Sequence, residues 1–318
     1  MKNVSSLLSV YAVACVLLFA GCVNSPGAGP GNNESSGNGT RPFLVTVPVS
    51  TTIEPPANVT SLQDRLTSLI DDGKIDEALS LADNESKTDP RVASYLNNIA
   101  VSLMQSRRLE DIDRILSKVS NMSPGNPDVW FNKALVLDRM GRDEDAVQAY
   151  NRTAQLNPGD SEAFYNEALL FDKLFRYREA IDAYNKTTAL KPNNTAAWYN
   201  MGIDLALLKR YDEAVIAYKK VSLIDSNDAD AYYNEGNSLS ALERYGEAIG
   251  AYKNATAANP KYADAWNNEG NALSALGRYK EAIDAYGKAL EINPNHPEAR
   301  KNNDTATGNL LEGNKTKK

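Results

Sequence analysis

The feature that most constrains this chain is a pattern that recurs every 34 residues between about residues 126 and 295. An aromatic column holds Trp130, Phe164, Trp198, Tyr232 and Trp266, and four positions later stand Ala134, Ala168, Gly202, Gly236 and Gly270. Further columns hold Ala146, Ala180, Ala214, Ala248 and Ala282, then Tyr150, Tyr184, Tyr218, Tyr252 and Tyr286. The unit closes on Pro158, Pro192, Pro260 and Pro294, and only Ser226 breaks that series. Independent columns in one register indicate a repeat protein.

The spacing within a unit predicts two helices. The aromatic residue, the small residue and an apolar residue stand at i, i+4 and i+7, which is one face of a helix. The alanine and tyrosine columns form the same stripe on a second helix, and the intervening turn has the length of a helix–helix connection. Proline ends the second helix, and Asn126-Pro127 suits an N-cap followed by a first-turn proline. Each unit is therefore expected to be a helical hairpin that must stack on its neighbours to bury both stripes.

The period and the W…G/A…Y…A…Y…P pattern, seen for example in AWNNEGNALSALGRYKEAIDAYGKALEINPN, resemble the tetratricopeptide repeat family. The resemblance covers roughly three quarters of the chain. It implies an all-α fold, a right-handed superhelical solenoid of helix-turn-helix repeats. It implies little about function, because one fold hosts many functions.

Seven units are predicted over residues 59–296, of which the first two are degenerate and carry aliphatic residues in place of aromatic ones. Residues 297–318 are polar and are expected to form a C-terminal capping helix and tail. Residues 22–58 are rich in Gly, Pro, Asn, Ser and Thr and are expected to be a flexible linker, with an r.m.s. span of roughly 30–35 Å.

Residues 1–21 are expected to be a signal peptide with a lipobox, because Lys2 precedes an apolar run that ends in Phe19-Ala20-Gly21 directly before Cys22. Cys22 would then be lipidated and become the mature N-terminus. An uncleaved membrane anchor and ordinary secretion are the alternatives, although the apolar run is short for a spanning helix. All three place the repeats outside the cytoplasm, and the first tethers them to the outer face of the cell membrane or cell envelope.

Composition excludes several classes of function. The formal charge of −7 leaves no basic footprint for nucleic acid. Both cysteines, Cys15 and Cys22, lie in the N-terminal segment, and His296 is the single histidine, so neither a zinc site nor a nucleophilic dyad is expected in the body. We predict no enzyme and no cofactor. Acidic pairs such as Asp143-Glu144 are interpreted as favouring helix N-termini.

Protein binding is the favoured function. The resemblance implies that first helices line the concave side and that variable positions beside the core stripe contact a partner. The predicted contact residues are aromatic, aliphatic, amide and acidic: Phe131, Leu135, Tyr165, Leu169, Tyr199, Ile203, Tyr233, Asn237, Asn267, Asn271, Asp128, Glu162, Asp138 and Asp172. They suit an extended or helical segment of another protein that carries apolar and basic residues. Arg139 and Lys173 are the only cations nearby, so the carboxylate clamp of chaperone-binding family members is not expected.

Two other interpretations stay open for these positions. The aromatic residues can instead complete the packing between repeats. The column of Asn132, Asn166, Asn200, Asn234 and Asn268 is expected to bond backbone between repeats.

The chain also carries a dense set of glycosylation sequons. The expected acceptors are Asn33, Asn38, Asn58 and Asn193, which fall in the linker or a turn. Asn151 and Asn185 are interpreted as coincidental, because their Thr153 and Thr187 fall on core columns.

Two functional hypotheses remain. The first is a membrane-tethered interaction scaffold that binds a partner peptide or protein in its groove. The second is a structural envelope protein whose repeats pack against neighbouring surface proteins without a dedicated ligand.

Overall fold

The computed structural model describes residues 61–315 of the chain, and over these residues the chain forms fifteen α-helices, one short 3-10 turn and no strand. The first helices of the successive pairs are α2 (Leu62–Asp71), α4 (Val92–Ser102), α6 (Pro127–Arg139), α8 (Ser161–Lys173), α10 (Thr195–Leu207), α12 (Ala229–Ala241) and α14 (Ala263–Ala275). The second helices are α3 (Ile75–Glu85), α5 (Leu109–Met122), α7 (Asp143–Leu156), α9 (Tyr177–Leu190), α11 (Tyr211–Ile224), α13 (Tyr245–Ala258) and α15 (Tyr279–Ile292). The turn Leu103–Gln105 extends α4, and α16 (Pro297–Lys315) follows the last pair.

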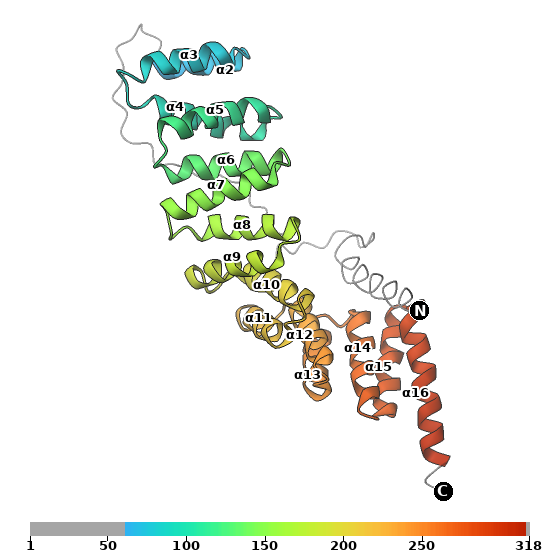
Figure 1. The fold of residues 1–318 in the computed structure, drawn as a ribbon. Helices are drawn as coiled ribbons and strands as arrows, with labels where there is room; N and C mark the ends of the chain where they lie inside the picture. Colours follow the sequence, from blue (N-terminus) through green and yellow to red (C-terminus); the bar gives the residue numbers. More distant parts are fainter. Residues whose placement is uncertain (1–60, 316–318) are drawn as a thin grey trace, which may run out of the picture. The chain divides into compact units, whose positions relative to one another are not determined.

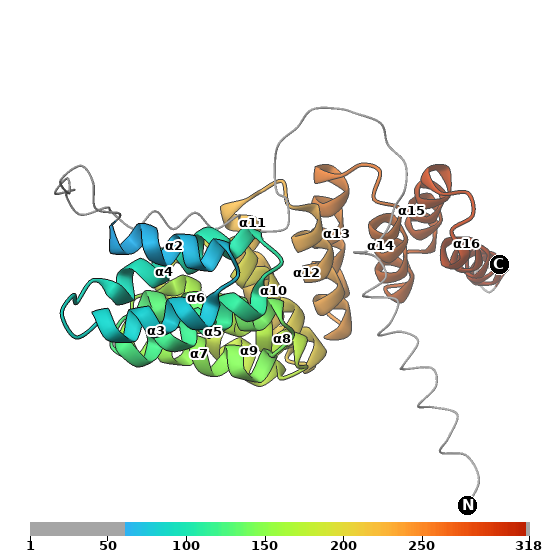
Figure 2. The same cartoon turned by 90° about the horizontal axis from the view of Figure 1, so that it is seen from above.

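Each helix packs against the helix before it and the helix after it, so the pairs succeed one another in chain order (Figures 1 and 2). This arrangement confirms the predicted all-α array of helical hairpins. The predicted signal peptide and the whole predicted linker, residues 1–58, lie outside the described residues. Within residues 61–315, no helix combines the length and the apolar character that a bilayer crossing requires.

Local sequence explains where the helices begin. Asn126 caps α6 through a bond from the Asp128 N–H to its side chain at 3.0 Å, and Asp160, Asn194 and Asp228 cap later first helices in the same way. The second helices have no side-chain cap. Their first turns carry acidic residues instead, which the helix dipole favours.

The turn inside each hairpin uses one residue with a left-handed backbone. Gly141 and Gly277 hold this position with φ of 74° and 71°. In the three units between them the position is occupied by side chains that rarely adopt such angles: Phe175, Lys209 and Glu243, with φ of 57°, 59° and 58°. The hairpin geometry therefore stores some backbone strain in the middle of the array.

The tyrosine column forms the centre of the core from α7 onward. Tyr150, Tyr184, Tyr218, Tyr252 and Tyr286 are all buried. A Cβ added to Gly202 would lie 2.7 Å from the Tyr218 ring, and one on Gly236 would lie 2.5 Å from the Tyr252 ring. The small-residue column is thus required by the direct contact between each first helix and the tyrosine of its own unit.

The tryptophans of the first column also hold the preceding turn. The indole N–H groups of Trp130, Trp198 and Trp266 donate to the carbonyls of Pro124, Pro192 and Pro260, at 3.1, 2.9 and 3.2 Å respectively. On α16 the same position is taken by Arg300, whose guanidinium donates to the Pro294 carbonyl at 2.8 Å. The last helix, α16, therefore makes the same contact with the preceding turn as the first helices of the repeats do.

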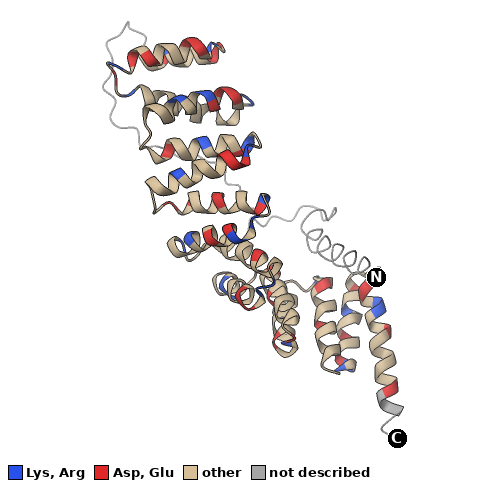
Figure 3. Ribbon diagram, viewed as in Figure 1, with Lys and Arg blue, Asp and Glu red and all other residues tan. Residues whose placement is uncertain are grey.

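Arginines join the pairs along the turn edge, where acidic and basic residues lie near one another (Figure 3). Arg142, Arg176 and Arg244 each pair with an acid three residues later and with an acid of the preceding pair, namely Asp113, Glu144 or Asp212. Each exposed pair contributes little stability. For Arg210 and Arg278 in the same column, the ion pair found is the one with the acid three residues later, so these links join some neighbouring units and not others.

Candidate functional site

The predicted contact residues form one row along the first helices, but they differ in exposure. Phe131 is only 7% exposed, and its ring lies edge-on to Tyr150 with centroids 5.5 Å apart. Tyr165, Tyr199 and Tyr233 are half-buried, and each ring packs on the core tyrosine of its own unit at 6.0, 5.8 and 6.2 Å respectively. The aromatic members therefore contribute to packing, and in three of the four part of the side chain remains accessible.

The hydroxyls of these tyrosines are bound by asparagines of the next unit. Asn234 donates to the Tyr199 hydroxyl at 2.9 Å, and Asn268 donates to the Tyr233 hydroxyl at 3.2 Å. In the first part of the array, Asn132 bonds Asn97 at 3.2 Å. The asparagine column thus links neighbouring units, as expected, but the expected backbone partners are wrong at these three positions. Side chains are bonded instead, because each amide faces the first helix of the preceding unit.

An apolar strip runs beside the tyrosines. Leu135, Leu169 and Ile203 occupy the same position in three successive units, and each is half-buried against the core. We call these three residues the apolar strip. A side chain that is half-buried at the same position of three adjacent helices offers further apolar area to a partner.

The predicted acidic residues are mostly engaged within the chain. Lys173 bridges Asp138 at 3.2 Å and Asp143 at 2.6 Å. Glu162 pairs with Lys191 at 3.3 Å, with both side chains half exposed. Two cations were noted near the predicted contact residues. Lys173 forms ion pairs with Asp138 and Asp143, and Arg139 donates to the Met104 carbonyl. Basic residues of a partner would therefore have to compete with internal pairs at these positions.

Two carboxyls, of which Asp204 is buried and Asp172 half-buried, form a pair between α8 and α10. Tyr184 donates its hydroxyl to Asp172, and the Asp172 carboxyl is hydrogen-bonded to Asp204 of the next first helix. Burial, followed by the bond to Asp172 and its charge, raises the pKa of Asp204 to about 9. Burial also raises the pKa of Asp172. The pair therefore holds a proton at neutral pH, because two carboxylates this close cannot both ionise.

Asp204 was not among the residues that the sequence singled out. It stands in a column that otherwise holds Val136, Leu170, Ser238 and Ala272. A lone acid in a column of small and apolar residues is the signal that could have found it. The pairing with Asp172 could not have been found in this way, because the two residues belong to different columns.

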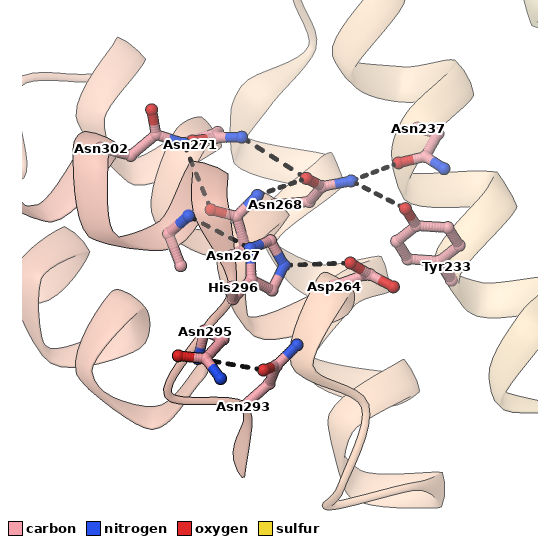
Figure 4. A network of polar contacts seen from close by, with 11 residues as sticks. Tyr233, Asn237, Asp264, Asn267, Asn268, Asn271, Asn293, Asn295, His296 and Asn302 are labelled. Carbon is pink, nitrogen blue, oxygen red and sulfur yellow. Dashed lines mark hydrogen bonds and ion pairs between the residues drawn. The ribbon is translucent and has the colours of Figure 1, made fainter. Parts of the chain in front are cut away.

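The row changes chemistry in the last units. Asn237 and Asn271 replace the apolar strip, and Figure 4 shows them linked to Asn268 and Asn302. Asn268 donates to the Asn237 Oδ1 at 2.9 Å, and Asn302 donates to the Asn271 Oδ1 at 2.9 Å. Asn267 is buried at 5% exposure, where it accepts from Asn302 and donates to Asn268. A continuous carboxamide network thus replaces apolar contacts from α12 to α16.

The acids in the first turns of α12 and α14 are bound as well. Tyr262 donates its hydroxyl to Asp230 at 2.8 Å, and the Nε2 of His296 lies 3.0 Å from Asp264. The Nδ1 of His296 accepts from the Ala299 N–H at 3.2 Å, so the Nε2–H is the donor to Asp264. His296 is thus the side chain that caps α16. Among residues 61–315, no group of His, Cys, Asp and Glu side chains is arranged to hold a metal ion.

One predicted glycosylation acceptor lies within the described residues. Asn193 is exposed in the turn between α9 and α10. Thr153 and Thr187 are fully buried, where each donates to a carbonyl of its own helix, in agreement with the core position assigned to them. Asn33, Asn38 and Asn58, together with Cys22, lie outside the described residues.

Three family models, each described as a tetratricopeptide repeat, match this chain. One covers residues 112–161 and 165–229, a second covers 229–262 and a third covers 263–296. Together they span more than half of the chain. No curated protein matches by sequence.

Solved structures show similar folds. The tetratricopeptide protein YrrB, described as having an unusual peptide-binding site, is 22% identical, with a TM-score of 0.53 over 58% of this chain and 96% of its own. The C-terminal part of a repeat protein from Cytophaga hutchinsonii is 16% identical, with a TM-score of 0.57 over 76% of this chain and 98% of its own. The MamA protein is 21% identical, with a TM-score of 0.50 over 53% and 92%. At these identities the likeness concerns the fold alone.

Proposed function

The chain belongs to the tetratricopeptide repeat family, and on this premise we propose that it is a non-enzymatic scaffold that binds another protein along its first helices. Membership supports an interaction scaffold in general.

The observation that carries the proposal is the apolar strip. Leu135, Leu169 and Ile203 pack against the buried core in three adjacent units, and each keeps part of its side chain exposed. Beside them, Tyr165 and Tyr199 are fixed by ring packing, so a partner that covers them would lose little side-chain entropy. These features suit a partner segment whose apolar residues recur with the spacing of the repeats.

The acids give the proposed partner its second property. Asp128 and Glu162 lie in the first turns of α6 and α8, and the Glu162 pair with Lys191 is half exposed. Lysine or arginine in the partner could replace Lys191 at small cost, since exposed pairs are weak. Asn237 and Asn271 continue the row with carboxamides, so we assign the apolar residues of the partner to α6–α10.

We also propose that the scaffold is exported and tethered by a lipid on Cys22 to the outer face of the cell membrane or envelope. The support is the sequence of residues 1–22, with its apolar run and the small residues before Cys22. The mass of the mature N-terminal peptide tests this part. A diacylated Cys22 supports it, and a retained Met1 in a cytosolic protein overturns it.

The binding role is tested by crosslinking in intact cells. A photoreactive residue replaces Leu169 in one variant. In the control variant it replaces Ile216, which is 57% exposed on α11 and is not one of the predicted contact residues. The proposal expects one polypeptide to be captured from Leu169 and not from Ile216. Substitution of Tyr165, Tyr199 and Tyr233 by alanine should then abolish capture with the helical content retained. Capture that survives the triple substitution, or none from Leu169, favours the structural envelope role.

A further inference from the structure

A hollow of about 310 Å³ lies between α14, α15 and α16. Its lining contains no Asp, Glu, Lys or Arg. The polar groups are carboxamides and hydroxyls: Asn271, Ser274, Tyr286, Asn302, Thr305 and Asn309. The hollow is therefore polar but uncharged, although a quarter of the residues in the chain are charged.

Three side chains of the hollow, Asn271, Tyr286 and Asn302, are hydrogen-bonded to other side chains of the protein. Tyr286 donates its hydroxyl to the Asn271 Oδ1 at 2.9 Å, and Asn302 donates to the same oxygen at 2.9 Å and to Asn267 at 3.2 Å. One bond from Asn271 goes to Asn268 at 3.4 Å. Among the described residues, nothing bonds the second amide hydrogen of Asn271 or the Oδ1 of Asn302. An amide donor on Asn271, which is exposed, and an amide acceptor on Asn302, which is half-buried, are thus accessible to a ligand from solvent.

The same set of residues occurs one unit earlier. Tyr252 donates to the Asn237 Oδ1 at 2.9 Å and lies 3.1 Å from Ser240, and Asn268 donates to Asn237 at 2.9 Å. These residues stand 34 positions before Tyr286, Asn271, Ser274 and Asn302. In the earlier units the asparagine position is apolar, so the set is confined to α12–α16. The same tyrosine–asparagine bonds therefore recur in adjacent units, which suits a ligand with a repeated structure, and the sets differ in that the Asn268 Oδ1 already accepts from Asn267 and Asn271.

We propose that α12–α16 form a binding site for a neutral oligosaccharide. Carboxamides and hydroxyls each offer donors and acceptors, as do the vicinal hydroxyls of a sugar ring. Tyr279, which also lines the hollow, adds an aromatic surface on which an apolar ring face can pack. The ligand is not a polypeptide and the apolar strip is not used, so this site goes beyond the proposed scaffold function.

Other ligand classes suit the hollow less well. A phosphate or carboxylate would meet no cation there, and a basic group would meet no acid. An apolar side chain would find only Ala275 and Ala306 besides the tyrosines, and these bury little area. An extended peptide could bond the amides through its main chain, and a neutral pentapeptide control distinguishes that ligand from a sugar.

Calorimetric titration of the full chain tests the site with chitotriose and mannotriose as neutral probes. Trigalacturonate serves as the acidic control, and a neutral Gly/Ser pentapeptide as the peptide control. The proposal expects at least one neutral trisaccharide to bind at about 10 mM or below. Asn271→Leu should weaken it at least tenfold, and the change suits the fold because Leu135 and Leu169 occupy that column. Asn302→Ser, at the end of the array, provides a second variant.

The matched control is Leu169→Asn, which should leave trisaccharide binding within about twofold while it weakens the protein partner. If the protein-binding proposal is wrong, Leu169→Asn will leave the affinity for the protein partner unchanged. The sugar titration does not depend on that result. Absence of binding by both neutral trisaccharides overturns the site. So does binding that Asn271→Leu and Asn302→Ser leave unchanged, or a pentapeptide that binds while the sugars do not.

Discussion

The first helices of α6–α10 and those of α12–α16 stand on the same scaffold but present different chemistry. Both regions bury the tyrosine column against small residues. In the first region the row carries Leu135, Leu169 and Ile203, whereas in the second it carries Asn237 and Asn271 within a carboxamide network. The contrast shows that the columns that build the repeat are separate from the columns that face a ligand. The recognition surface can therefore change while the core is kept.

The largest expected effect on the free energy of unfolding comes from the buried tyrosine column, which the two regions share. Tyr218→Ala and Tyr252→Ala should each destabilise the array by about 3–5 kcal/mol, because a large buried ring is lost in either region. Chemical denaturation followed by circular dichroism measures both. A cost that is several-fold smaller in one region would break the claim of a common scaffold.

The largest pH effect is expected in the first region. The pKa of Asp204 is raised to about 9 by burial and by Asp172, so the folded chain keeps a proton that the unfolded chain releases above about pH 4. The free energy of unfolding should therefore fall as pH rises from about 4 to about 9, by up to about 1.4 kcal/mol per pH unit. Denaturation at pH 5 and pH 8 measures this fall.

Asp204→Asn supplies the control, because an amide cannot titrate. The variant should lose most of the difference between pH 5 and pH 8. A slope as steep as that of the original chain would assign the effect to other groups, among them Glu167, Glu235 and Glu269, whose pKa values are also raised by burial.

Removal of a core tyrosine hydroxyl should cost different amounts of stability in the two regions. Tyr252→Phe loses the bonds to Asn237 and Ser240 and leaves an amide oxygen less satisfied, at a cost of about 1 kcal/mol. Tyr218→Phe should be close to neutral, because no hydrogen bond of its hydroxyl is found among the described residues. Equal costs for the two substitutions would mean that the carboxamide network adds no stability.

The smallest effects are expected in the hairpin turns. Phe175→Gly should stabilise the array by about 0.5–1 kcal/mol, because the left-handed backbone at this position strains any residue with a Cβ. Gly141→Ala, at the same position one unit earlier, should destabilise by a similar amount. Thermal melts of the two variants should shift in opposite directions, and shifts of the same sign would refute this account of the turn.

The fold could be predicted because it depends on the same residue types recurring at the same positions of every unit. A period of 34 residues and the tyrosine and alanine columns specify the hairpin and its stacking, and the structure confirms both. The degenerate first units were also recognisable, since Leu66, Ile70 and Leu96 fill the core with aliphatic side chains there.

The site was less predictable because its contacts join different columns of neighbouring units. Asn268 reaches Asn237 across 31 residues, and Asp172 reaches Asp204 across two first helices. Such pairs depend on how far one unit is rotated on the next, which a periodic pattern alone does not specify. For the same reason the buried positions of Phe131 and Asn267 could not be told from the half-buried position of Tyr199.

The affinity of the captured partner for three chains tests the central claim most directly. These are the original chain, a chain with Leu169→Asn and Ile203→Asn, and a chain with Asn237→Leu and Asn271→Leu. We predict at least a tenfold loss of affinity in the second chain and a change of affinity within about twofold in the third. Equal losses in both variants, or a loss only in the third, would contradict the division of the row into two recognition surfaces.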